Sequence, residues 1–162
     1  METPNPPNTL PAIGLLKQLD ENLRQGLSKR GRFETYMPGK KLAVQGEPHH
    51  TMSLILSGKV VVSVHAHGDY VELATLGAGE TIGEMNMIDP QKASADVIVR
   101  EKSDVWQIDQ SEFRAIVDDS PLDACHILLW LGRQLCHRIR FNSEKMLRQA
   151  ELMRMQFREM DY

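Results

Sequence analysis

The stretch LILSGKVVVSVHAHGDYVELATL, residues 54–76, decides the fold class of this chain. Its runs of aliphatic and β-branched residues are separated by Gly58 and by the turn signal His67-Gly68-Asp69. A layer of helices would need longer runs of 3.6-residue period, and this stretch contains none. It therefore predicts antiparallel strands joined by a hairpin.

The same pattern continues on both sides, from about Phe33 to Ile108. Ala95–Val99 and Val105–Ile108 supply two more short strands, and glycines recur at positions 39, 46, 58, 68, 77, 79 and 83. Short strands with turns at this spacing predict a mainly β domain, a jelly-roll (double-stranded β-helix) barrel with flanking helices.

The flanking segments have helical period. Leucines at positions 15, 16, 19, 23 and 27, followed by Gly31, predict a short N-terminal helix. Ser111 suits the N-cap of a short helix Glu112–Val117, and Pro121 suits the first turn of a long helix that continues to the C-terminus. We expect three parts: a proline-rich disordered or extended arm at 1–11, the β domain with its N-terminal helix at 12–120, and the long helix at 121–162.

The long helix carries a heptad stripe. Apolar and small residues recur in steps of four and three from Cys125 to Met160, which is typical of a coiled coil. We expect the first two turns of this stripe to pack on the chain's own barrel and the rest to pair with an identical chain. The predicted homodimer interface comprises Leu129, Gly132, Cys136, Ile139, Ser143, Met146, Ala150, Met153 and Phe157.

Composition excludes several classes of protein. With 162 residues, 25% charged and 41% hydrophobic, the chain suits one globular domain and not wholesale disorder. Its net charge of -3 gives no basic field for nucleic acid, and no run approaches the roughly 18 apolar residues of a membrane helix. The start, METPNPPNTLP, is no secretory signal. Cys125 and Cys136 lie too far apart on one helix to bond to each other, so a reducing cytoplasm is the expected location.

A second stretch, LGAGETIGEMNMID at residues 76–89, carries the chemistry. Gly83 and Glu84 open a short helical turn, where free backbone amides favour an anion. The carboxylate of Glu84 would repel a phosphate, so we expect it to accept a hydrogen bond from a ribose hydroxyl.

These residues, in this order, resemble the cyclic nucleotide-binding domain family, in particular the sensor half of Crp-Fnr-type bacterial regulators. The resemblance covers about Leu15 to Met153 and rests on Pro38-Gly39, Gly46-Glu47, the segments 55–60, 76–80 and 82–85, and Ile108-Asp109. Asn142-Ser143-Glu144-Lys145 matches the family's Thr-Ser-Glu-Lys tetrad at the dimer seam.

The resemblance implies a cyclic nucleotide, cAMP or another, as the ligand in the barrel, and no further cofactor. Backbone amides of Gly83 and Met85 would bind it, Glu84 would hold the ribose 2′-hydroxyl, Ser94 would contact the phosphate, and Asn142 and Ser143 would meet the purine. The family's phosphate-binding arginine is expected at Ala93, or at Ser94 in a longer alignment, and neither is arginine. Lys92 is one residue away and would substitute only in part, because lysine is a point charge and not a fork.

Two functions remain open at this point. The first is a non-enzymatic regulatory sensor that acts as a homodimer on an unidentified effector protein, with weakened or altered ligand binding. The second is a ligand-free interaction and dimerisation module on the same fold. No serine elbow, His-Glu-x-x-His motif or Walker loop suggests an enzyme.

Metal and DNA binding are not expected. His65-Ala66-His67 with Glu72 resembles a cupin metal motif at the wrong spacing, and we expect a solvent-exposed hairpin tip there. Direct sequence-specific DNA binding is not expected, because the family's helix-turn-helix domain follows the long helix and this sequence ends at Tyr162. Arginines along the long helix, among them Arg138, alternate with glutamates and are interpreted as the solvated flank of a coiled coil.

Overall fold

In the described part of the chain, eight strands form two antiparallel sheets, as the alternation of apolar residues and glycines predicts. The computed structural model describes residues 9–66 and 68–160, so residues 1–8 of the expected N-terminal arm lie outside it. One sheet has the order β1 (Arg32–Tyr36), β8 (Ser103–Asp109), β3 (Thr51–Ile55) and β6 (Thr81–Ile82). The other has the order β2 (Lys41–Ala43), β7 (Asp96–Val99), β4 (Val60–Ala66) and β5 (Asp69–Leu76). The predicted jelly-roll architecture is confirmed.

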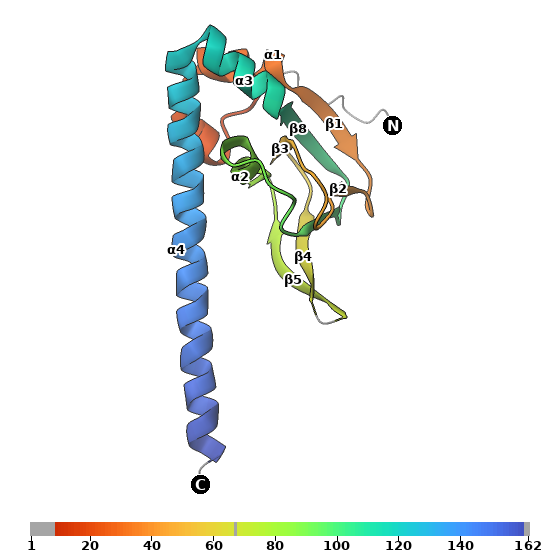
Figure 1. Cartoon of the computed structure of the whole chain (residues 1–162), viewed down its shortest axis with the longest axis vertical. Helices are drawn as coiled ribbons and strands as arrows, with labels where there is room; N and C mark the ends of the chain where they lie inside the picture. The colour runs from red at the N-terminus through yellow and green to blue at the C-terminus, as the bar shows by residue number, and fades with distance from the viewer. Residues whose placement is uncertain (1–8, 67, 161–162) are drawn as a thin grey trace.

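The predicted hairpin is the β4–β5 pair. Val60 lies opposite Leu76 and Ala66 opposite Asp69, with a shift in register between Val62 and Ser63. In Figure 1 the hairpin projects from the body of the domain, and β5 lies at the edge of its sheet. Seven of the eight residues of β5 are exposed, which leaves this strand open toward the long helix beside it.

Two clusters of buried side chains form the core. One lies beneath the helices and includes Leu16, Trp106, Ile127 and Leu131. The second lies within the barrel and contains Ala43, Ile55, Val60, Leu76, Ile82, Ala93, Val97 and Val99. Burial of these aliphatic side chains, at roughly 25 cal/mol per Å² of apolar surface, is the main force that holds the two sheets together.

The N-terminal helical segment is two elements and not one helix. A 3₁₀ helix η1 (Gly14–Gln18) is followed by α1 (Glu21–Arg30). Asp20 separates them, because its backbone is extended and its carboxylate accepts a hydrogen bond from the Leu23 amide as an N-cap. The leucine period is correct, but it does not reveal the break.

The helix after β8 is longer than its sequence suggests. α3 runs from Gln110 to Asp119 and begins directly after Asp109, so Ser111 lies inside the helix and does not cap it. α4 then begins at Pro121, as predicted, and continues to Met160. Along one side of the domain α4 passes the sheets, and its C-terminal part extends beyond the tip of the β4–β5 hairpin (Figure 1).

The face of α4 that packs on the barrel is not the predicted heptad stripe. The buried residues are Ala124, Ile127, Trp130, Leu131 and Gln134. On the stripe, both cysteines are exposed and Leu129 is 57% exposed, so the expectation that its first turns pack on the barrel is wrong. The helix therefore has two apolar faces, and the stripe is free along its described length.

The exposed heptad stripe continues into the part of α4 that extends beyond the barrel. Ile139, Met146 and Met153 are 65%, 70% and 61% exposed, and the side chain of Phe157 lies outside the described part. Although α4 has 40 residues, neither it nor another helix of residues 9–160 is apolar enough to cross a membrane.

Candidate functional site

Glu84 lies at the point where β6 turns into a short helix. α2 (Glu84–Ile88) follows β6 after the single residue Gly83, whose φ of 76° is in the left-handed region. A Cβ at this position would come within 2.4 Å of the Thr51 carbonyl oxygen, so only glycine fits. This tight turn directs the Glu84 side chain inward, where Glu84 is 1% exposed.

Arg138 of α4 holds this buried carboxylate. Its guanidinium donates to Glu84 Oε1 at 2.5 Å and to the Thr81 carbonyl oxygen. The other carboxylate oxygen, Oε2, and the hydroxyl of Thr81 are buried and have no hydrogen-bond partner in the described structure. Buried polar atoms are rarely left unpaired, so this junction of β6, α2 and α4 retains the capacity to bind a further polar group.

A cavity of about 370 Å³ lies beside this junction, between β5 and α4. Lys145 crosses it and donates to the Leu73 carbonyl oxygen at 3.2 Å. Its walls combine strand residues that are mainly aliphatic, the anionic Glu80 of the β5–β6 connection, and cationic, polar and aromatic residues of the helix: Val62, Leu73, Ala74, Thr75, Leu76, Glu80, His137, Arg138, Phe141, Asn142 and Lys145. Such a mixture suits a ligand that has both an apolar ring system and polar or anionic groups.

The structure brings some of the predicted ligand residues together. Asn142 lines the cavity, and Glu84 is held by Arg138, a residue outside the predicted set that lines the cavity one helical turn before Asn142. Ser143 is exposed on another face of the helix, where its hydroxyl donates to the Ile139 carbonyl oxygen at 2.9 Å. Met85 is 59% exposed.

The other predicted residues lie at the segment after α2. Lys92 and Ser94 are exposed, and the side chain of neither makes a hydrogen bond or ion pair within the described part of the chain. Ala93 is buried in the barrel cluster with Leu76, which also lines the cavity. The position at which the family's arginine is expected therefore faces the barrel interior, while its two neighbours face solvent.

Arg138 is the site residue that the sequence interpretation missed. The alternation of arginines and glutamates predicts a solvated coiled-coil flank at this position, yet the Arg138 side chain is 34% exposed and ion-paired. The spacing of Arg138 could have indicated its role. Residues four apart on a helix share a face, and Arg138 is four residues before the predicted ligand residue Asn142.

His49 packs against the Gly83 turn from the β2–β3 connection. A Cβ on Gly83 would lie 2.7 Å from its Nε2, which is buried and unpaired in the described structure. Burial lowers the pKa of His49 below its ordinary value of 6.5, more than its hydrogen bond with the Thr51 backbone raises it. The neutral imidazole is thus the form that the fold accommodates.

This burial predicts a pH-dependent stability. The pKa of His49 is lower in the folded than in the unfolded chain. The favourable contribution of neutral His49 to the free energy of unfolding is therefore present above about pH 6.5 and is lost as the pH falls through the pKa of the folded chain. We expect the Tm to fall between about pH 7.5 and 5.5 in the wild type and to fall less in His49→Gln. Thermal unfolding at a series of pH values measures this. The same change at the exposed His126 should leave the pH profile intact, and identical profiles for wild type and His49→Gln would contradict the assignment.

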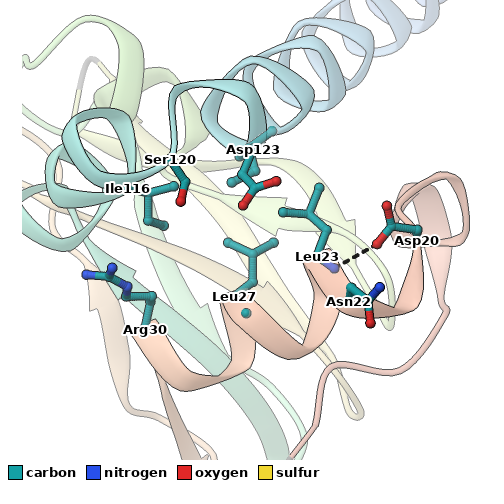
Figure 2. Close-up of a pocket in the computed structure, with 10 residues that line it drawn as sticks. Asp20, Asn22, Leu23, Leu27, Arg30, Ile116, Ser120 and Asp123 are labelled. Carbon is teal, nitrogen blue, oxygen red and sulfur yellow. Dashed lines mark hydrogen bonds between the residues drawn. The ribbon is translucent and has the colours of Figure 1, made fainter.

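A second cavity, of about 260 Å³, lies between α1 and the junction of α3 with α4 (Figure 2). Two of its charged residues, Asp20 and Arg30, already have structural partners. Asp20 caps α1, as the dashed line in Figure 2 shows, and Arg30 forms ion pairs with Asp119 and Glu112. We therefore assign this cavity no ligand.

His65 of the β4–β5 hairpin does not line the candidate cavity. His65 is exposed at the end of β4, with its ring edge-on to Tyr70, and His67 lies outside the described residues. Within the described ranges, no group of three His, Cys, Asp or Glu side chains is arranged to hold a metal ion.

Comparisons with known sequences agree with this geometry. The Cyclic AMP receptor protein of Thermus thermophilus is 32% identical over 101 residues, which are 62% of this chain and 47% of that protein. Glutaminase 1 of Bradyrhizobium diazoefficiens is 30% identical over 107 residues, 66% of this chain and 17% of that protein. The chain thus spans less than half the length of each of these relatives.

Solved structures share the fold. A cyclic nucleotide-binding domain from Methylobacillus flagellatus superposes with a TM-score of 0.77 at 23% identity, covering 81% of this chain and 74% of that one. The Catabolite Activator Protein of Thermus thermophilus gives a TM-score of 0.70 at 26% identity, covering 84% and 62%. Residues 33–120 match the model of the cyclic nucleotide-binding domain. This chain belongs to the cyclic nucleotide-binding domain family.

Proposed function

We propose that the chain is a non-enzymatic regulatory module that binds a cyclic nucleotide between β5 and α4 and acts as a homodimer. The observation that carries this proposal is the buried Glu84 carboxylate, with one oxygen held by Arg138 and the other unpaired in the described structure. A ribose hydroxyl could donate to the unpaired oxygen without displacing Arg138. Glu84 thereby links the ligand to α4.

The cavity walls suit the rest of such a ligand. Leu73 and Phe141 offer apolar surfaces to a purine ring, and Asn142 offers both donors and acceptors to its edge. Arg138 and Lys145 place positive charge on the helix side of the cavity, which favours a ligand of net negative charge.

Weak or altered affinity for a cyclic nucleotide is expected because residue 93 is alanine and not arginine. Ala93 supplies no charge, and two lost charge-assisted hydrogen bonds correspond to roughly a hundred-fold loss of affinity. The regulatory subunit of a cAMP-independent protein kinase A from Trypanosoma brucei has the fold, and a triple variant of it that gains an arginine has been solved bound to cAMP.

The module would act on a partner protein. We propose that the exposed heptad stripe of α4 pairs with an identical chain, that an effector protein reads the dimer, and that the chain acts in the cytoplasm without contacting DNA itself. Leu129, Ile139, Met146 and Met153 are each more than half exposed, so the free chain leaves this stripe to solvent. A second copy of the chain would bury this stripe, and the apolar contacts would have to offset the translational and rotational freedom lost on association.

A cross-linking experiment tests the dimer. In a parallel pair of helices Cys136 faces its own copy, so a Cys125→Ser variant treated with diamide should form a disulfide-linked dimer on a non-reducing gel. The control is Arg148→Cys in a chain without the native cysteines, because residue 148 lies about 120° around the helix from residue 136. Equal cross-linking of the two variants would contradict the predicted seam.

Direct titration tests the ligand. The name of the Thermus thermophilus relative makes cAMP the first nucleotide to try, and cGMP is the second. A regulator from Xanthomonas campestris with this fold is described as responsive to c-di-GMP, which is the third. We expect saturable binding to the wild type in isothermal titration with at least one of them and weaker binding to Glu84→Gln. A folded dimer that binds none of the three would refute the ligand part of the proposal.

The second candidate function is a ligand-free dimerisation and interaction module. The observation that favours it is the Arg138–Glu84 ion pair, which already neutralises the carboxylate without any ligand. In that case the titrations would detect no nucleotide binding, while Cys136 would still form the disulfide-linked dimer. The two experiments together therefore separate the candidates.

A further inference from the structure

A buried asparagine ties together the segments around the candidate site. Asn86 lies in α2, two residues after Glu84, and is only 9% exposed. Its side-chain amide nitrogen donates to two backbone carbonyl oxygens, that of His49 at 2.8 Å and that of Gln91. Both donor positions of the amide group are therefore used.

The two carbonyls belong to segments that lie far apart in the sequence and pair with each other. The Gly46 amide donates to the Ala93 carbonyl and the Ala93 amide donates to the Glu47 carbonyl, both at 2.8 Å. Pro48 and Lys92 form an isolated antiparallel bridge between the same segments. Asn86 stands at the end of this short ladder and joins it to α2.

A third segment meets the same residue. The side-chain amide of Gln110, at the start of α3, donates to the Asn86 carbonyl oxygen at 3.3 Å, and the Gln110 backbone amide donates to the His50 carbonyl at 2.8 Å. An aliphatic side chain at position 86 would leave the carbonyl oxygens of His49 and Gln91, which are partly buried, without these donors. Segments that lose such hydrogen bonds open locally more often than segments that keep them.

We propose that Asn86 is a positioning residue that holds residues 89–93 and the Glu84 turn in one arrangement whether or not a ligand is bound. The segment that carries position 93 is then fixed by the chain's own hydrogen bonds. A ligand would act through the contact of Glu84 with α4, and not by reordering this segment. The route by which a ligand would act rests on the proposed function, whereas the role of Asn86 in the ligand-free chain does not.

Amide hydrogen exchange of the ligand-free protein tests the inference. The amides of Asp89 and Ala93, which donate to Met85 and Glu47, should be protected in the wild type. In Asn86→Ala both should exchange at least about ten-fold faster, while amides of β4 and β8 keep their wild-type rates. Asn86→Leu, which keeps more of the side-chain volume, should behave in the same way. The local effect distinguishes positioning from a general loss of stability.

Gln91→Ala is the matched control. It removes an exposed side chain but keeps the backbone carbonyl that Asn86 binds, so exchange at Ala93 should not change. Exchange of the wild-type Ala93 amide at the rate of an unstructured peptide would overturn the inference, even if both Asn86 variants fail to fold. Slowing of that amide by more than about ten-fold on addition of a bound cyclic nucleotide would overturn it too. If no nucleotide binds, the proposed function fails, and the exchange of the free chain still decides the role of Asn86.

Discussion

Replacing Arg138 by glutamine is expected to lower the free energy of unfolding by about 2 kcal/mol. The change leaves the Glu84 carboxylate, 1% exposed, without its charged partner and removes the donor to the Thr81 carbonyl. Removal of one partner of a fully buried pair costs about 3–5 kcal/mol. The Arg138 side chain is 34% exposed, so water compensates part of that cost. Chemical denaturation of the purified protein measures the difference.

A double-mutant cycle assigns this effect to the ion pair. Glu84→Gln keeps the shape of the side chain and removes its charge, and a coupling energy with Arg138→Gln of about 1 kcal/mol or more is expected. The control is Arg148→Gln on the same helix, at an exposed position, where a change within about 0.5 kcal/mol is expected. If the two single changes add within about 0.3 kcal/mol in the double variant, the two side chains do not interact as the structure has them.

Ala93→Arg should tighten cyclic-nucleotide binding by roughly a hundred-fold relative to the wild type. The reason is geometric as well as chemical. Residue 93 faces the barrel cluster that includes Leu76, and Leu76 lines the cavity, so a guanidinium at this position can reach toward the ligand space. Its planar fork would bind the phosphate through two parallel hydrogen bonds. Isothermal titration with the nucleotide that binds the wild type most tightly measures the gain.

Two further variants separate charge from size at position 93. Ala93→Lys supplies a charge without the fork and should give only part of the gain. Ala93→Met supplies length without charge and should give none. A folded Ala93→Arg protein that binds no more tightly than Ala93→Met would show that the phosphate of the ligand does not lie near this position.

The strands and their hairpin could be predicted because their pattern is local. The Val60–Val64 run, the glycines and the turn at Gly68 determine which segments pair, and β4 and β5 form where they were expected. The break between η1 and α1 could not be read from the leucine period. It depends on one capping residue, Asp20, which a continuous helical pattern conceals.

The long helix shows why the site was predicted only in part. An α-helix can carry two apolar stripes, and sequence period alone does not tell which of them faces the chain's own barrel. The heptad stripe was clear, but the buried face is a different one, with Ile127, Leu131 and Gln134. Arg138 continues that buried face, so its contact with Glu84 is a tertiary pairing between residues 54 positions apart. Only the fold brings them together.

The measurement that tests the central claim most directly is a chemical-shift titration of the ¹⁵N-labelled protein with the nucleotide that binds it. The account predicts perturbed amides in two places at once, at Gly83–Met85 and at Arg138–Asn142, because the ligand lies between α2, β5 and α4. It also predicts that Glu84→Gln weakens the perturbation at both. Saturable perturbations confined to another region, such as the cavity between α1 and the α3–α4 junction, would contradict the account.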